Sequence, residues 1–455
     1  MKKKLIDRFS IRYIISRTYI MTGHRFFYRK MQSKFNSRIP KDRPVLIAPN
    51  HQNALMDAMA NVRTSGRDLV FLTRADVFNN RFIAALFRIY KMLPVYRMRD
   101  GASELSKNED IFNESMQVLL RKICPVVIYV EGNHGDKRRL RPLVKGIFRI
   151  AFQAQESYGE KPGVVIVPCG IDYSNYTNFR SKLFVQYGEP IEVSEYYAEF
   201  KENSARAINK LRARLSEEMK KYIIHIPSEE HYDTYMLLRQ TYNQRMRERL
   251  GFSKKDLHHR LLADQHMIRE LSKVEEAHPE KMPPLTELAK EYQTGVKKLG
   301  LRDWIFRKNR HSLLALILAD LGLLIMLPVY LYGVITHILI YMTCQKVGSN
   351  IKDSQFQSTV KFLLGLILFT IWYPILFVLA WVFTDPGWIK WAFLASLPLS
   401  GLLAHTWFIW FKKMRSLWRY QFMTLAKNKR LARLKELRKQ IIEITESLIS
   451  DKSHT

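Results

Sequence analysis

A histidine and an aspartate stand six positions apart just after a short apolar run, Val45-Leu46-Ile47, that is bounded by Pro44 and Pro49. The run predicts a buried strand ending in a turn, and a helix is expected just beyond it. In that setting Asp57 can hold the His51 imidazole in one tautomer while the ring accepts a proton from a hydroxyl group. The pair alone is not specific, because helix caps and unrelated surface residues give the same spacing.

Three further clusters follow predicted strands of the same region. The first, 93–97, ends in Arg97; the second, 128–139, contains a glutamate, two glycines and a run of bases; the third is the stretch Val165–Gly170. The carboxyl ends of parallel strands meet at one edge of a sheet, where a catalytic site is expected. We therefore expect these clusters to lie near the His/Asp pair.

The second cluster has the composition of an anion site. A glutamate and a glycine after a buried strand, followed by three bases, make a turn that brings backbone N–H groups and cations onto one small anion. Charge-assisted hydrogen bonds make phosphate a favoured ligand there, and the alternative is a solvated basic loop. The residues are Glu131, Gly132, Lys137, Arg138 and Arg139, and His134 within the same loop is a second candidate base.

The elements that would position these residues alternate between short apolar runs and helical patterns from residue 44 to 191. This alternation predicts an α/β domain whose mostly parallel sheet is covered on both faces. Strands are expected at Val45–Ala48, Leu69–Thr73, Leu93–Tyr96, Pro125–Val130, Val164–Pro168 and Leu183–Tyr187, and helices at Ile83–Met92, Leu105–Arg121 and Lys145–Gln155.

The chain has 455 residues and a formal net charge of +31, which implies a negatively charged partner surface. RNP-type aromatic signatures, zinc-finger spacings and a basic region leading into a zipper are absent from the sequence, so a nucleic-acid partner is not expected. An anionic membrane is favoured instead. The three cysteines have no paired spacing, and we expect neither a metal site nor a disulfide.

Residues 1–43 hold thirteen Lys/Arg and two acids among apolar positions. Basic residues recur too often for a transmembrane span, and the pattern predicts amphipathic helices on the membrane surface, with Phe27, Met31 and Phe35 on one face. The alternative is a helix docked on the following domain. Residues 192–310 form a predicted helical region, in which His258, His259 and His266 are expected to be surface residues rather than metal ligands.

Residues 311–411 contain three long apolar segments, 313–342, 362–383 and 391–411, each at or beyond the roughly 20 residues that cross a bilayer. The first contains Asp320 and is interrupted by Pro328, so it is either a re-entrant hairpin or one long tilted helix. Lys/Arg-rich flanks predict that the last two segments form a hairpin whose turn faces away from the cytosol.

Residues 412–455 form a basic tail that suits the cytoplasmic leaflet. Lys412 to Gln440 contain eleven Lys/Arg and one acid. An apolar repeat of about two heptads then predicts a helix packed on its own domain, because a coiled coil needs three or four heptads. The repeat consists of Leu434, Leu437, Ile441, Ile444 and Leu448.

Four blocks, in order, resemble the glycerolipid acyltransferases of the lysophosphatidate and glycerol-3-phosphate type. The stretch 50–57 resembles the family's His/Asp block, and 94–97 resembles the arginine-bearing block. Glu131-Gly132 resembles the Phe-Pro-Glu-Gly block, and Val167-Pro168 resembles the fourth. Four blocks in the same order are far more specific than any one of them.

Three departures point to one branch of that family. Five residues separate His51 from Asp57 where the usual block has four, Val130 replaces the proline before Glu-Gly, and His134 stands where arginine is common. The departures are similar to the fungal-type glycerol-3-phosphate acyltransferases, which also carry membrane segments after the domain. The extra residue requires the helix start to bulge or shift so that Asp57 still reaches the histidine ring.

The resemblance implies that His51 removes a proton from the acceptor hydroxyl while Asp57 holds the ring. The freed oxygen then attacks an acyl thioester of CoA or acyl carrier protein, which needs no metal or redox cofactor because the thioester is already activated. Arg97 and the cluster 137–139 would hold the acceptor phosphate, and Glu131 with Gly132 would organise the loop or contact the glycerol.

The resemblance favours a cytosol-facing, membrane-bound enzyme of phospholipid synthesis with glycerol-3-phosphate or lysophosphatidate as acceptor. Two alternatives remain. One is acyl transfer to another lipid hydroxyl, such as that of an amino-acid lipid. The other is a non-catalytic membrane protein that binds lipid on the same fold.

Overall fold

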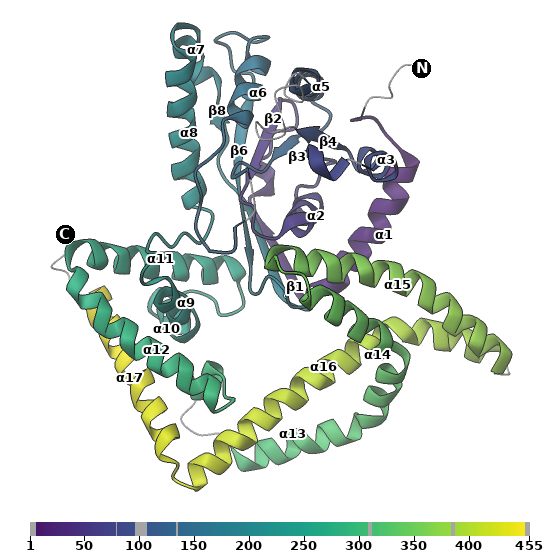
Figure 1. Cartoon of the computed structure of the whole chain (residues 1–455), viewed down its shortest axis with the longest axis vertical. Coiled ribbons are helices and arrows are strands. Elements are labelled where there is room, and N and C mark those ends of the chain that lie inside the picture. Colours follow the sequence, from purple (N-terminus) through teal and green to yellow (C-terminus); the bar gives the residue numbers. More distant parts are fainter. Residues whose placement is uncertain are drawn as a thin grey trace. The chain divides into compact units, whose positions relative to one another are not determined.

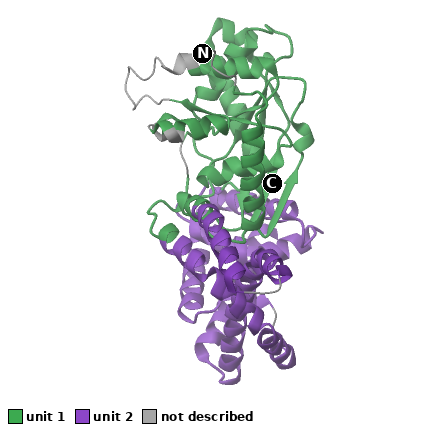
Figure 2. Ribbon diagram, turned by 90° about the vertical axis from the view of Figure 1, so that its right-hand side faces the viewer, with its two compact units in different colours: residues 1–225, 347–363 green, residues 226–346, 364–455 purple. Residues whose placement is uncertain are grey.

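The computed structural model describes residues 6–78, 80–95, 107–132, 135–307, 312–383 and 387–450. The chain forms two compact units, and each is assembled from two separate stretches of sequence (Figure 2). Unit 1 comprises residues 1–225 with 347–363, and unit 2 comprises residues 226–346 with 364–455.

An eight-stranded sheet forms the centre of unit 1 (Figure 1). The strand order is β1-β7-β6-β2-β5-β3-β4, and β8 pairs with β6. Neighbours are parallel from β6 to β4, whereas β7 and β8 run antiparallel to β6. The mostly parallel α/β sheet is thereby confirmed. The strands are β1 (Lys30–Lys34), β2 (Val45–Pro49), β3 (Val70–Arg74), β4 (Met92–Val95), β5 (Val126–Ile128), β6 (Val165–Tyr173), β7 (Lys182–Tyr187) and β8 (Ile191–Glu192).

All six expected strands are present, but β1 corrects our expectation for the N-terminal region. The helical face that we assigned to Phe27, Met31 and Phe35 does not form, because the helix ends at Phe27 and Met31 lies in β1. Strand β1 pairs in parallel with β7, about 150 positions later in the chain, with Met31 opposite Leu183. Such non-local pairing leaves no signal in the local pattern of charged and apolar residues.

Helices cover both faces of the sheet. The core on one face is formed by α5 (Lys107–Arg121), α6 (Gly146–Gln155) and α8 (Ser204–Lys220), which pack on the inward-facing residues of β2 to β6. On the other face lie α1 (Ile11–Phe27) and α2 (Ala54–Thr64). Two shorter helices, α3 (Arg81–Ile89) and α7 (Tyr197–Glu202), also belong to this part of the unit.

Helix α1 is docked on unit 1, which was the alternative to a helix that lies only on the membrane surface. Four of its residues are buried against the unit: Tyr13, Met21, His24 and Phe27. Its opposite face is apolar and exposed, and this face carries Ile11, Ile14, Ile15, Tyr19 and Phe26. Contact of that outer face with a membrane stays a prediction.

Unit 2 contains a helical cluster and the long apolar helices. The cluster consists of α9 (Tyr232–Thr241), α10 (Asn243–Arg249), α11 (Leu257–Ala277), α12 (Met282–Lys298) and α17 (Lys429–Ser450). Helix α17 packs on α11 and α12, with four of the five residues of the apolar repeat buried and Ile444 half-buried. The tail therefore packs on its own unit, as the short repeat predicts.

Within the described residues, three helices are long and apolar enough to cross a membrane: α14 (Leu327–Ser349), α15 (Ser354–Phe383) and α16 (Gly387–Leu425). The first predicted segment is broken, because a shorter apolar helix, α13 (Leu313–Ile325), ends with Met326 as its C-cap, two residues before Pro328. The turn predicted between the last two segments falls largely at 384–386, outside the described residues.

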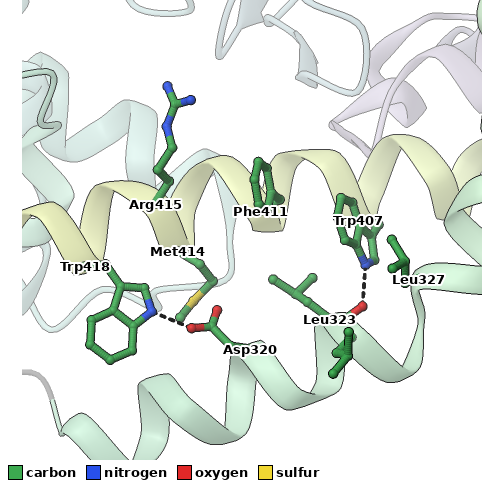
Figure 3. A pocket seen from close by; sticks show the side chains of 9 residues that line it. Asp320, Leu323, Leu327, Trp407, Phe411, Met414, Arg415 and Trp418 are labelled. Atoms are coloured by element: carbon green, nitrogen blue, oxygen red, sulfur yellow. Dashed lines mark hydrogen bonds between the residues drawn. The ribbon is translucent and has the colours of Figure 1, made fainter.

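The acid within the first apolar segment is paired inside unit 2. The Asp320 carboxylate accepts a hydrogen bond from the Trp418 indole, and the Trp407 indole donates to the Leu323 carbonyl at 2.8 Å (Figure 3). Both bonds cross from α16 to α13, beside an apolar groove of about 440 Å³. The hydrogen bond from Trp418 gives this half-buried carboxylate a polar partner.

Candidate active site

The turn between β2 and α2 places the His/Asp pair at the carboxyl edge of the sheet. Asn50 follows β2 directly, and its side-chain amide continues the hydrogen bonding of β2 with β6. The amide donates to the Ile171 carbonyl at 3.1 Å and accepts from the Ile171 N–H at 2.7 Å. One residue later, His51 Nδ1 lies 2.9 Å from Asp57 Oδ2. The two residues therefore form a hydrogen-bonded dyad in which the carboxylate selects the ring tautomer.

The extra residue between His51 and Asp57 is accommodated by a distorted helix start. Ala54, the first residue of α2, has a φ of +44°, in the left-handed region that side chains with a Cβ rarely adopt. A residue held there costs on the order of 1–3 kcal/mol. The bulge that the spacing demanded is thus present, and the structure around the turn must offset its strain.

Asp57 is saturated with hydrogen-bond donors. Its Oδ2 accepts from His51 and also from the backbone N–H groups of Gln52, at 2.9 Å, and Asn53, at 2.8 Å. Its Oδ1 accepts from the Tyr173 hydroxyl at 2.8 Å. With its side chain 1% exposed, the carboxylate has one orientation relative to the ring.

Tyr129, which follows β5, stacks on the face of the His51 ring. The two ring centroids are 3.9 Å apart with an interplanar angle of 18°. Burial, and secondarily the Asp57 charge, raise the pKa values of Tyr129 and Tyr173 well above that of a free tyrosine, so both phenols stay protonated. Neutral aromatic groups thus fix the ring plane, and a protonated phenol supports the carboxylate.

Glu131 holds the backbone of the turn that carries His51. Its Oε1 accepts the His51 N–H at 2.9 Å, and its Oε2 accepts Arg141 Nε at 3.1 Å and Arg141 N at 3.3 Å. Burial raises the pKa of Glu131, although these hydrogen bonds oppose the shift. Of the two roles expected for this residue, these contacts match organisation of the loop.

Both the backbone conformation at position 132 and the small space around it require a glycine there. Its φ is +66°, and a Cβ built on it would lie 2.6 Å from Val144 Cγ1. Any other residue would therefore be strained and would push against the chain that leads into α6. The Glu-Gly sequence allows the glutamate to turn back toward His51.

The basic loop lies against the dyad. Gly135 N–H donates to the His51 carbonyl at 3.2 Å, and the Gln52 amide donates to the Lys137 carbonyl at 3.0 Å. The loop that carries the predicted phosphate ligands is thereby brought to the same turn as His51.

The three bases of that loop have different environments. Arg138 is buried, pairs with the Asp172 carboxylate and donates to the Tyr173 carbonyl. Lys137 is exposed and Arg139 is half-exposed. The cluster therefore divides into one cation with a structural ion pair and two that reach solvent.

Two predicted functional residues, Arg97 and His134, lie outside the described residues. Conversely, the structure brings to the site Tyr129, Tyr173 and Arg141, which our sequence reasoning did not assign. The only sequence signal for Tyr129 was its place two residues before Glu131, in the cluster 128–139. For Tyr173 and Arg141 the deciding signal is spatial, since their partners lie far away in the chain or across a turn.

Residues 30–172 match the family model described as Acyltransferase. The chain is 29% identical over 161 residues to glycerol-3-phosphate O-acyltransferase 2 of Saccharomyces cerevisiae, and 31% identical over 83 residues to glycerol-3-phosphate O-acyltransferase 1 of the same yeast. This stretch of the chain therefore resembles the acyltransferase domain of glycerolipid acyltransferases. The His/Asp turn and the Glu-Gly loop both lie inside the matched acyltransferase domain.

These similarities cover part of each protein. They span 34% and 18% of this chain, and 21% and 11% of the two yeast proteins. An uncharacterized acyltransferase of Schizosaccharomyces pombe is 21% identical in an alignment of 260 positions, and the match covers 38% of this chain and 38% of that protein. The solved 1-acyl-sn-glycerophosphate acyltransferase PlsC of Thermotoga maritima aligns with 46% of this chain and 81% of its own, at 19% identity and a TM-score of 0.32.

Proposed function

We propose that this chain is a membrane-bound O-acyltransferase that moves an acyl chain from an acyl thioester to glycerol-3-phosphate. The observation that carries the proposal is the contact between His51 Nδ1 and the buried, four-times hydrogen-bonded Asp57 carboxylate. With Nδ1 held on Asp57, Nε2 on the opposite side of the ring is the atom that accepts the proton.

In the proposed reaction, His51 Nε2 takes the proton of the acceptor hydroxyl as its oxygen attacks the thioester carbonyl. The Asp57 carboxylate stabilises the imidazolium that forms. When the tetrahedral intermediate collapses, the C–S bond breaks, and the imidazolium returns the proton to the leaving sulfur. The products are an acyl ester and a free thiol, and His51 is again neutral.

A phosphate-bearing acceptor is supported by the charges beside the dyad. Lys137 and Arg139 reach solvent on a loop that is hydrogen-bonded to residues 51 and 52, whereas Arg138 is paired with Asp172. We assign the phosphate to Lys137 and Arg139, together with Arg97 as the resemblance implies. The names of the two yeast relatives favour glycerol-3-phosphate over lysophosphatidate.

The membrane arrangement is part of the same proposal. Helices α14, α15 and α16 cross the bilayer, since each is long and apolar enough. The acyltransferase domain faces the cytosol, and the net charge of +31 holds the chain on anionic lipid. The donor is acyl-CoA or acyl carrier protein, and neither a metal nor a redox group takes part.

The test supplies the purified full chain in detergent with one labelled acyl-CoA and, in separate reactions, with glycerol-3-phosphate, lysophosphatidate or an ornithine lipid. We expect the largest kcat/KM with glycerol-3-phosphate, and product only at background level with His51→Ala. Preference for the ornithine lipid would overturn the assignment of the acceptor. Lack of transfer to all three would overturn acyl transfer to these lipid hydroxyls.

A further inference from the structure

The start of a candidate membrane helix belongs to the acyltransferase unit. Residues 347–363 cluster with unit 1, although α15 continues to Phe383 as one helix. Ser358, in the second turn of α15, is fully buried, and its hydroxyl donates to Asn53 Oδ1 at 2.5 Å. Asn53 is the residue that precedes α2 in the catalytic turn.

Two neighbouring contacts fix this part of α15. Lys361 Nζ donates to the Thr177 carbonyl at 3.3 Å. The Phe362 ring meets the edges of two α1 rings, Phe27 at a centroid distance of 5.7 Å and His24 at 6.1 Å. Ser358 therefore lies on a helix turn that other elements of unit 1 hold in place, so its hydrogen bond can fix the position of the Asn53 side chain.

Asn53 connects that helix turn to the dyad. Its backbone N–H donates to Asp57 Oδ2 at 2.8 Å, and its side-chain amide donates to the Tyr176 carbonyl at 3.2 Å. The side-chain oxygen, which is fully buried, is the acceptor for Ser358. One residue thus binds the catalytic carboxylate through its backbone and the start of α15 through its side chain.

The catalytic turn needs such support because it is strained. Ala54, directly after Asn53, has a φ of +44°. A strained residue persists only where the surrounding structure over-determines it, and here the hydrogen bonds of Asn53 do so from one side. Loss of the Ser358 hydroxyl would leave the Asn53 oxygen buried without this donor and would allow the turn to relax.

We propose that Ser358 is a positioning residue of the acyl-transfer reaction, which acts through Asn53 to hold Asp57 against His51. The start of α15 is then part of the active-site framework as well as the beginning of a candidate membrane helix. This inference rests on the proposed function, because its effect is on the proton transfer that the dyad carries out.

The effect is expected in kcat rather than in KM. The Ser358 hydroxyl donates to Asn53, so we expect its loss to disturb the alignment of the ring and the carboxylate while substrate binding stays unchanged. Loss of one buried hydrogen bond predicts a fall in kcat of about three- to tenfold for Ser358→Ala. Ser358→Cys, with a weaker donor of similar size, should fall between wild type and Ser358→Ala.

Thr359→Val is the matched control. Thr359 is the next residue of α15, is buried, and its hydroxyl has no hydrogen-bond partner among the described residues. The substitution removes a polar atom from the same helix turn without touching Asn53. We expect its kcat to equal that of wild type within a factor of two, on the order of the scatter of such comparisons.

A double-variant cycle with Asn53→Ala separates action through Asn53 from general loosening. Asn53→Ala keeps the backbone N–H that binds Asp57 and removes the acceptor of Ser358. The kcat values of the full-length variants are compared in detergent, and thermal unfolding of each variant checks that all of them are folded. Ser358→Cys replaces Ser358→Ala if the alanine variant does not fold. We expect Ser358 substitution to have no further effect on kcat in the Asn53→Ala background.

An unchanged kcat for the Ser358 variants, a rise in KM alone, or additive effects in the cycle would overturn the inference. Those outcomes require a wild-type chain that turns over. A wild-type chain that transfers no acyl group would instead overturn the proposed function, and the inference with it.

Discussion

The Tyr173 hydroxyl donates a hydrogen bond of 2.8 Å to Asp57 Oδ1, the carboxylate oxygen that does not face His51. The bond joins the end of β6 to α2 and leaves both oxygens of Asp57 occupied. A carboxylate held from both sides cannot rotate to follow a displaced imidazole. The alignment of the proposed general base therefore depends on a phenol 116 positions away in the chain.

Tyr173→Phe should lower kcat about tenfold and leave KM almost unchanged, because a buried oxygen of Asp57 loses a charge-assisted hydrogen bond. Steady-state acyl transfer measures both constants. The matched control is Tyr235→Phe in unit 2, where an equally buried phenol donates to Glu275 at 2.8 Å. A similar loss of kcat in both variants would mean that the effect is one of general stability.

Glu131→Gln should lower kcat about tenfold or more. Both side-chain oxygens of Glu131 now accept hydrogen bonds, one from the His51 N–H and one from Arg141 Nε. In the glutamine variant an amide NH2 group replaces one of these oxygens, so two donors would face each other and the turn would shift. Glu192→Gln is the control, since that glutamate also pairs with an arginine, Arg43, but far along the sheet. Equal activity of the two variants would contradict the role assigned to Glu131.

Substitutions of the three bases in the 137–139 cluster should have different effects, on substrate binding in two cases and on stability in the third. Lys137→Ala and Arg139→Ala should each raise the KM for glycerol-3-phosphate by about fivefold to tenfold, with little change in thermal stability. Arg138→Met should lower the unfolding midpoint, because removal of one partner of a buried ion pair costs about 3 kcal/mol. A KM effect confined to Arg138→Met, with the other two silent, would reverse the assignment.

Local patterns were sufficient for much of this fold. Short apolar, β-branched runs predict β2 to β7. Pro328 indicated an interruption of the first apolar segment, with one long tilted helix as the alternative, and in the structure α13 ends three residues before this proline. The dyad follows from one strand-to-helix turn, which is also a local feature.

Features that depend on distant partners could not be predicted. Basic and apolar residues at 30–34 have no strand signature of their own, and β1 exists because β7 offers a free edge. Arg138 looked like a phosphate ligand until its buried position beside Asp172 was known. The contact between Asn53 and Ser358 spans 305 positions, and a single sequence carries no record of it.

His24 should make the folded chain sensitive to acid. Burial lowers its pKa from 6.5 to about 3, and both ring nitrogens lack hydrogen-bond partners among the described residues. The unfolded chain therefore binds one more proton between pH 6.5 and 3, and stability falls as pH falls through this window. The loss between pH 7.5 and pH 5 is about 2 kcal/mol.

His24→Phe should remove that sensitivity while keeping the ring contacts with Tyr28 and Phe362. Thermal unfolding in detergent at pH 7.5 and pH 5 measures the difference, with a substitution at a half-exposed histidine, His278→Phe, as control. Parallel acid losses in wild type and His24→Phe would show that other groups dominate. The substitution leaves the dyad in place, so activity at pH 7.5 provides a check on folding.

The central claim is that His51, held by Asp57, is the general base of acyl transfer. Its most direct test is the single-turnover rate of acyl transfer from labelled acyl-CoA to glycerol-3-phosphate by the full-length chain and by His51→Ala, at saturating substrate. The account predicts a fall of about 100-fold or more, within the range that general acid–base catalysis contributes. A His51→Ala rate within a factor of about three of wild type, well below that range, would contradict it.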